Sequence, residues 1–468
     1  MDDSRGDAMT LAASWNRWWV VVGALLIQLS LGAVYIWSVF QTPLQRAFPT
    51  WTEPQVTLPA QIVLAAFAVA VILGGRLQDK LGPRKVATAG GLLVGSGLIL
   101  ARFTGQFQSE VALGWLVATF SVMGGLGIGA GYVCPIATCV KWFPDKRGLV
   151  TGLAVAGFGA GAFFFAPLAR GLISGTPYEL LGVRLFPLPA LGVFDTFLVL
   201  GVVFLVTVVL GAQLLRNPPP GYTPPGRIVS GIVGGAVARE HLSPSEMLRT
   251  PAFWLLWLSY LAGCTAGLQV IMKVSPIWQS FALSATRPFS EADFQRVASA
   301  GAMAVSMLAI FNSLGRIFWG RVSDSLGRKT TLFLAFTICG LAMLSLEHLR
   351  TYSLYLLGIC TVGLCFGGFL ALYPAVTSDY FGTQHLGANY GWMFTAYGVG
   401  GLLGPFLAAA LMEPMGSVTY YVTDAQGESV ERVLALGNYR RAFWFAGISC
   451  LLAGLICLTL RRPALRRI

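Results

Sequence analysis

The chain contains the stretch Gly75-Arg-Leu-Gln-Asp79-Lys-Leu-Gly82-Pro-Arg84-Lys85. It returns as Gly320-Arg-Val-Ser-Asp324-Ser-Leu-Gly327-Arg328-Lys329, in which Gly, Asp, Leu and Gly recur at a constant offset of 245 positions (320 − 75). A repeat in register over this distance indicates two halves built on one pattern, each with this turn between its second and third long segments. The repeat therefore predicts a fold of two similar halves.

The residue types of this motif suit a tight turn between two helices. Gly allows a close backbone approach, and Asp79 or Asp324 can cap a helix end and pair with a neighbouring Arg or Lys. Arg84 and Arg328 follow each Asp and supply cations for ion pairs. We expect these four charged residues to act in gating. The alternative is a charged loop without a mechanical role.

Long apolar segments recur along the whole chain. Of its 468 residues, 55% are hydrophobic and 11% are charged, a balance that favours lipid over a water-soluble core. A helix needs about 20 apolar residues to span a bilayer. Twelve segments meet this length, which predicts an all-α membrane protein with two six-helix halves. The segments are 18–41, 56–75, 84–103, 111–141, 149–174, 191–215, 252–279, 297–320, 328–347, 353–377, 389–412 and 440–460.

The charges around these segments predict their orientation. The first segment is too long for a removable signal peptide, and no small-residue cleavage site follows it. Lys and Arg concentrate in alternate loops, which predicts a multi-pass protein of the plasma or inner membrane with both termini in the cytoplasm. We attribute the net charge of +12 to this topology and to anionic lipids, and not to nucleic-acid binding.

A second repeat extends the two-half pattern. Trp142-Phe143 precedes Pro167 by the same spacing with which Tyr380-Phe381 precedes Pro405. Residues 216–250 carry Pro-rich clusters and scattered charge, which is typical of a linker. We therefore expect an N-terminal half over 1–215, a cytoplasmic linker over 216–250 and a C-terminal half over 251–468.

The repeated turn resembles that of the major facilitator superfamily over the whole chain. Within that superfamily, four motifs in order resemble the oxalate:formate antiporter family, which is related to the monocarboxylate transporters. They are Gly32-Ala-Val-Tyr35-Ile-Trp-Ser-Val-Phe40, Gly129-Ala-Gly-Tyr132-Val-Cys-Pro135, Lys141-Trp-Phe-Pro-Asp-Lys-Arg-Gly148 and Asn217-Pro-Pro-Pro-Gly-Tyr222. The resemblance implies alternating access around a central site. It also implies transport of small carboxylates, by exchange or together with protons.

Ionisable residues inside membrane helices are costly and mark functional positions. Apart from the basic residues in loops and at the ends of the predicted spans, three remain inside them, Arg170, Lys273 and Arg316, and no Asp or Glu lies near the middle of any span. We therefore expect an electropositive pathway that suits an anion.

Arg316 is the residue that we expect to bind the anion. Its guanidinium offers two parallel hydrogen bonds to a carboxylate, and Asn312 lies one helical turn away. The resemblance implies the same role, because the family has a substrate Arg in its eighth helix. Lys273 is expected to provide a second cationic contact. The alternative for either side chain is snorkelling to a membrane interface.

One departure from the family pattern bears on the cargo. The resemblance implies a Lys in the eleventh helix of oxalate exchangers, where this chain has Phe394-Thr-Ala-Tyr397-Gly398. Tyr397 donates a hydrogen bond but carries no charge. We therefore expect monocarboxylates such as lactate, pyruvate or formate, unless Lys273 restores the second charge. Tyr35, Tyr132, Tyr390 and Phe394 are expected to complete the cavity, with core packing as the alternative.

Other function classes fit the sequence less well. An enzyme needs clustered catalytic side chains, whereas His241, His348 and His385 are scattered in loops without ligand spacing. We expect no enzymatic activity, metal or cofactor, and a monomer in the lipid bilayer whose partner is a small carboxylate anion. The resemblance implies an Asp one turn before the substrate Arg in proton-coupled monocarboxylate transporters, where this chain has Asn312, which does not titrate. Proton symport would therefore need another group or the substrate's own proton, and symport and anion exchange both stay open. The alternatives are an oxalate:formate-type dicarboxylate exchanger and a transporter-like sensor.

Overall fold

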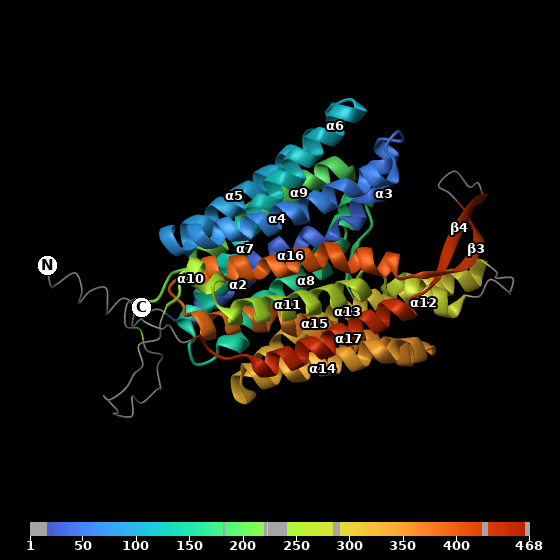
Figure 1. Cartoon of the computed structure of the whole chain (residues 1–468). Coiled ribbons are helices and arrows are strands. Elements are labelled where there is room, and N and C mark those ends of the chain that lie inside the picture. The colour runs from blue at the N-terminus through green and yellow to red at the C-terminus, as the bar shows by residue number, and fades with distance from the viewer. Residues whose placement is uncertain are drawn as a thin grey trace, which may run out of the picture. The chain divides into compact units, whose positions relative to one another are not determined.

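The computed structural model describes residues 16–180, 183–219, 222, 241–283, 291–423 and 429–463. In this part of the chain, twelve helices are long and apolar enough to span a membrane (Figure 1). Each overlaps one of the twelve predicted segments, which confirms the fold class. They are Trp18–Ile36, Pro54–Leu81, Pro83–Gln106, Ser109–Trp142, Arg147–Ser174, Gly192–Gln213, Pro251–Ile271, Arg296–Leu326, Arg328–His348, Tyr352–Phe381, Leu386–Ala410 and Arg440–Thr459.

Several of these spans combine more than one helical element, and two β-hairpins lie between spans. In chain order, the elements are α2 (Trp18–Leu31), η1 (Gly32–Ile36), α3 (Ser38–Ala47), α4 (Glu53–Leu81), α5 (Pro83–Ala101), η2 (Arg102–Gln106), α6 (Ser109–Leu116), η3 (Val117–Met123), α7 (Gly124–Trp142), α8 (Arg147–Ser174), β1 (Tyr178–Leu180), β2 (Val183–Phe186), α9 (Gly192–Gln213), α10 (Pro244–Leu248), α11 (Pro251–Ile271), α12 (Val274–Ala282), α13 (Glu291–Leu326), α14 (Arg328–Ser345), η4 (Leu346–His348), α15 (Tyr352–Phe381), α16 (Leu386–Ala410), β3 (Glu413–Thr423), β4 (Ser429–Asn438) and α17 (Arg440–Thr459).

The chain packs as two compact units. The first comprises Met1–Phe253, Ala371–Gly398 and Arg462–Ile468, and the second comprises Trp254–Leu370 and Val399–Arg461. Within the first unit, α5 packs against α9 and α4 against α7. The end of α15 and the start of α16 also belong to this unit. The domain boundaries expected from the sequence, 1–215, 216–250 and 251–468, describe two halves and a linker, which is a different division from these compact units. These boundaries stay a prediction.

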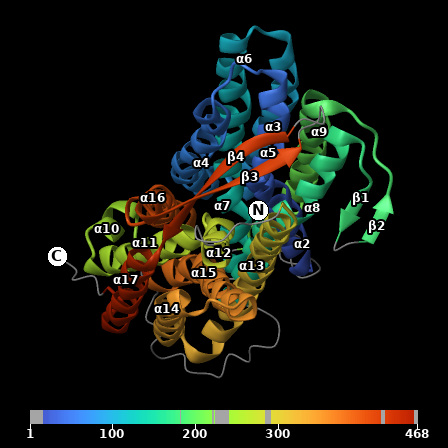
Figure 2. The same ribbon diagram turned by 90° about the vertical axis from the view of Figure 1, so that its right-hand side faces the viewer.

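The second unit is a helical body with one long hairpin. Its helix α14 packs against α17, and α12 against α13. Strands β3 and β4 pair antiparallel, as Figure 2 shows, and were not predicted from the sequence. A small apolar cluster joins the hairpin to the neighbouring helices, and its buried members are Leu283, Phe294, Val418 and Leu436. The hairpin is therefore part of the packed unit.

The linker is described only at its ends, because residues 220, 221 and 223–240 lie outside the described part of the chain. At its start, the Trp142 indole donates a hydrogen bond of 2.5 Å to the Arg216 carbonyl, and the Tyr222 ring packs edge-on against Trp142. At its end, Ser243 and Glu246 form a capping box that begins α10. The hydrogen bonds from Ser243 lower the pKa of Glu246.

The close approach of η1 to α8 depends on Gly32. A Cβ atom at this position would lie 2.0 Å from the Phe158 carbonyl oxygen. We expect Gly32→Ala to destabilise the protein by about 1–3 kcal/mol, because backbone must move to admit the methyl group. Thermal unfolding in detergent measures this loss.

Gly114 provides the matched control, since nothing lies within 4 Å of a Cβ placed there. Gly114→Ala is expected to be neutral or stabilising by roughly 0.5–1 kcal/mol, as Ala is the better helix former. Equal effects of the two substitutions would contradict the packing argument for Gly32.

Candidate functional site

The first copy of the repeated turn holds the start of another helix. Gly82 adopts a positive φ of 86° between α4 and α5, and Pro83 begins α5. Near the end of α4, the Asp79 carboxylate accepts hydrogen bonds from the backbone N–H groups of Gly387 (3.2 Å) and Ala388 (2.8 Å). These groups belong to the first turn of α16, whose N–H donors have no partner within the helix. We call this contact the Asp79 cap.

Charge and close packing support the Asp79 cap. The Lys141 ammonium lies 3.8 Å from the Asp79 carboxylate, and the Gln78 amide donates to it at 2.6 Å. The negative carboxylate also faces the positive end of the α16 dipole. A Cβ atom at Gly75 would lie 2.0 Å from the Gly387 carbonyl oxygen, so only Gly allows this approach. Arg84 instead donates to the Gln213 carbonyl at 2.8 Å.

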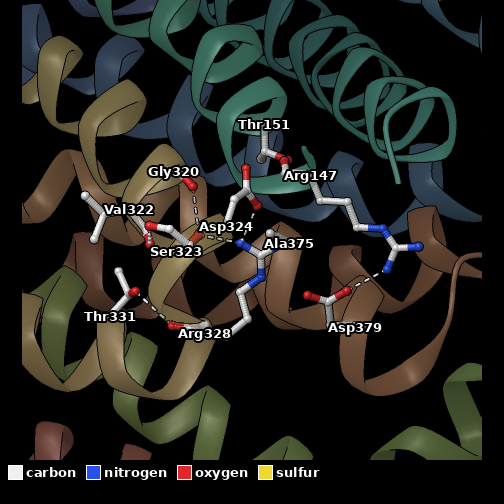
Figure 3. Close-up of polar contacts among 12 residues, drawn as sticks. Arg147, Thr151, Gly320, Val322, Ser323, Asp324, Arg328, Thr331, Ala375 and Asp379 are labelled. Atoms are coloured by element: carbon white, nitrogen blue, oxygen red, sulfur yellow. Dashed lines mark hydrogen bonds and ion pairs between the residues drawn. The ribbon is translucent and has the colours of Figure 1, made fainter. Parts of the chain in front are cut away.

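The second copy of the turn makes a more local contact. Gly327 has a φ of 83°, matching Gly82, and again separates two helices. The Arg328 guanidinium donates to the Asp324 carboxylate at 2.9 Å and also contacts the Ser323 hydroxyl (Figure 3). The two copies thus share a backbone shape, while the contacts of Asp79 and Asp324 differ.

An ion pair that the sequence analysis did not predict joins α8 to the end of α15. Arg147 donates to the Asp379 carboxylate at 2.6 Å, and both side chains are largely buried (Figure 3). The second repeat contains a sequence signal that could have drawn attention to Asp379. Phe143 and Phe381 are 238 positions apart, and the same offset takes Lys141 to Asp379 (141 + 238). Equivalent positions in the two halves therefore carry opposite charges.

The aromatic candidates come together in the first unit. The Tyr35 and Tyr397 hydroxyls are 2.6 Å apart, and the Tyr397 ring stacks on Phe394 at 4.8 Å. Tyr132 and Tyr390 also pack against Phe394, with ring centroids 5.1 and 5.7 Å away. All five predicted residues thus form one cluster. Phe67 and Phe158 join it and were missed, because isolated Phe residues in apolar helices look like core.

The cationic candidates lie in the second unit. Arg316 on α13 is only 1% exposed, and its Nε lies 3.4 Å from the Asn312 side-chain oxygen, a long contact for a hydrogen bond. Lys273 stands at the break between α11 and α12, where it is the N-cap of α12 and is partly buried. Broken membrane helices are frequent at transporter binding sites. Arg170, by contrast, is exposed.

Comparison with known proteins assigns the fold and its repeats to a family. The sequence profile of the Major Facilitator Superfamily matches residues 8–405 and 277–468. The chain belongs to this superfamily. Its members are transporters and not enzymes, so the chain is a multi-pass membrane transporter.

Curated relatives cover most of this superfamily member. It is 29% identical over 83% of its length to YhjX, an uncharacterised transporter of Escherichia coli, covering 86% of that protein. It is 28% identical to the oxalate:formate antiporter of Oxalobacter formigenes, with 88% of each chain covered. Human monocarboxylate transporter 12 is 25% identical, with 86% of this chain and 76% of the relative covered. The relationship to both predicted families is confirmed.

A solved structure supports the major facilitator fold independently. The proton:xylose symporter XylE superposes with a TM-score of 0.66 at 12% identity, covering 94% of this chain and 95% of its own. This likeness concerns the fold alone.

The Arg147–Asp379 pair is testable by charge reversal. We expect Arg147→Asp or Asp379→Arg alone to destabilise the protein by about 3 kcal/mol, because each places like charges together in a largely buried contact. The double substitution should recover most of that loss in thermal unfolding. The exposed pair Arg102–Asp195 at 2.7 Å is the control, and its reversal should change stability by about 0–1 kcal/mol. Additive single effects at Arg147 and Asp379 would refute their pairing.

Proposed function

We propose that the protein is a secondary active transporter of small carboxylate anions that prefers monocarboxylates. The main support is the burial of Arg316 at 1% exposure within a membrane-spanning helix, beside the Asn312 amide. A guanidinium stays charged in proteins and is costly in an apolar interior, so such a position favours a functional role over snorkelling. An anionic ligand with two oxygens matches its geometry.

The names of the relatives point to the same cargo class. One is described as an oxalate:formate antiporter and another as a monocarboxylate transporter. Tyr397, which replaces the Lys implied for oxalate exchangers, pairs its hydroxyl with Tyr35 and brings no charge. We therefore favour lactate, pyruvate or formate over oxalate, with Lys273 as the residue that could reverse this preference. An oxalate:formate-type exchanger and a transporter-like sensor are the alternatives.

The proposed mechanism is alternating access of an N-terminal half (1–215) and a C-terminal half (251–468) joined by the linker 216–250. The Asp79 cap and the Asp324–Arg328 pair, which lie at the two copies of the repeated turn, are the proposed gate elements. Arg84 anchors the first copy of the turn to α9. The charge distribution favours a cytoplasmic location for both copies of the turn and for both termini, in a plasma or inner membrane. A monomer suffices for this mechanism.

Uptake into proteoliposomes tests the function directly. Labelled lactate, formate and oxalate are supplied outside, with either an imposed pH gradient or an internal counter-anion. Stimulation by the pH gradient alone would identify proton symport, whereas dependence on internal anion would identify exchange. Absence of carboxylate uptake under both conditions, in protein that remains folded, would reject the transport proposal.

Arg316→Lys is the sharpest single test of the binding residue. Lys keeps the charge but loses the paired donors, so we expect uptake to fall by about 10- to 100-fold, corresponding to roughly 1.4–3 kcal/mol. Thermal unfolding serves as the folding control. Uptake close to that of the wild type would reassign Arg316 to a structural role.

Tyr397→Lys tests the cargo preference. The added cation is expected to raise the ratio of oxalate to lactate uptake, although desolvation of Lys offsets part of the gain. Lys273→Gln is the comparison variant and should leave that ratio low. If the wild type already prefers oxalate and Lys273→Gln abolishes the preference, Lys273 is the second cation and the monocarboxylate proposal is wrong.

A further inference from the structure

The end of the linker lies along the turn that joins α15 to α16. Three hydrogen bonds hold it there, and all lie within the first compact unit. The Leu242 N–H donates to the Phe381 carbonyl at 3.0 Å, and the Thr383 N–H donates to His241 Nδ1 at 3.2 Å. The Asn389 amide donates to the Leu242 carbonyl at 2.9 Å. We call His241 and Leu242, with these bonds, the linker clip.

Burial makes the Asn389 bond the most demanding of the three. Asn389 is 0% exposed and Leu242 is 2% exposed, so neither end of this bond is open to water. The side-chain oxygen of Asn389, Oδ1, is buried without a hydrogen-bond partner among the described residues. Since a buried donor without a partner is costly, the amide strongly favours a conformation that keeps Leu242 in place.

The same turn of α16 supplies the donors of the Asp79 cap. Gly387 and Ala388 donate to Asp79, and Asn389 follows them directly. The aromatic candidates Tyr390, Phe394 and Tyr397 come next on this helix. From Gly387 to Tyr397, the helix rises only about 15 Å, so a shift of its first turn moves all of these groups together.

We propose that Asn389 is a positioning residue that couples the linker to the Asp79 cap. By tying the first turn of α16 to Leu242, it fixes the direction of the two N–H groups that Asp79 captures. When the clip opens, the cap loses its alignment, and the start of α16 is free to move with its aromatic side chains. The linker therefore takes part in gating. The consequence for transport rests on the proposed function, whereas the coupling itself does not.

A double-mutant cycle on thermal stability tests the coupling without any substrate. Asp79→Asn and Asn389→Ala are measured singly and together in purified full-length protein. We expect the double variant to be only slightly less stable than the less stable of the two single variants. The reason is that either substitution alone already disrupts the coupled Asp79 cap and linker clip. Strictly additive losses would overturn the proposal.

Gln269→Ala is the matched control for the cycle. Gln269 is likewise a buried amide that donates to one backbone carbonyl, that of Ala442 at 3.0 Å, and its oxygen also lacks a partner among the described residues. It lies in the second compact unit. Combined with Asp79→Asn, it should give additive losses. Coupling as strong as that of Asn389 would show a general effect of buried amides and would also overturn the proposal.

Limited trypsin digestion reports the clip itself. Arg239 and Arg249 flank His241 and Leu242 in the sequence. Loss of the Asn389 bond should speed cleavage at these sites by about tenfold, which is the effect of one buried hydrogen bond. His241→Ala, at an exposed position, should act in the same direction more weakly and serves if Asn389→Ala does not fold. Cleavage unchanged in both variants would contradict the clip.

Transport measurements separate the two proposals. If carboxylate uptake occurs, we expect Asn389→Ala to change its maximal rate more than its KM, because the residue acts on gating. A change confined to KM would assign Asn389 to substrate binding instead. If the wild type shows no carboxylate uptake while the cycle and the digestion behave as expected, the proposed function fails and the coupling stands.

Discussion

The capture of two free N–H groups of α16 by the Asp79 carboxylate is the contact on which the rest of this region depends. It needs Gly75 to let the backbones meet, Gly82 to turn the chain after Asp79, and Lys141 nearby to balance the charge. A helix start offers both open donors and a favourable dipole, so one carboxylate satisfies several requirements. The repeated motif thus has a physical reason for its spacing.

Much of the fold could be predicted because membrane spans follow from local apolar length. The twelve segments and the repeat needed no knowledge of distant contacts. The β3–β4 hairpin escaped prediction, since its pairing and its apolar anchor at Val418 and Leu436 form only when distant segments meet. The interruption of the seventh span at Lys273 was also missed, because the sequence around it stays apolar.

The candidate site was predictable where a residue type is unusual for its surroundings. Arg316 stands out in an apolar helix, and its burial agrees with that signal. The tyrosines offer hydroxyl donors in apolar helices, and Tyr390, Phe394 and Tyr397 share one helix face by their spacing. All five predicted aromatic residues form one cluster. The Arg147–Asp379 pair was not predicted, because each residue resembles an ordinary charged residue at a helix end. Their pairing over 232 positions is a property of the folded chain.

The opposite charges at Lys141 and Asp379 also bear on how such a protein assembles. If the second copy of the repeat were identical to the first, it would carry a Lys in place of Asp379. That Lys and Arg147 would then repel each other. The opposite charges thus make the two copies of the repeat complementary, so that one copy could not stand in for the other at this ion pair.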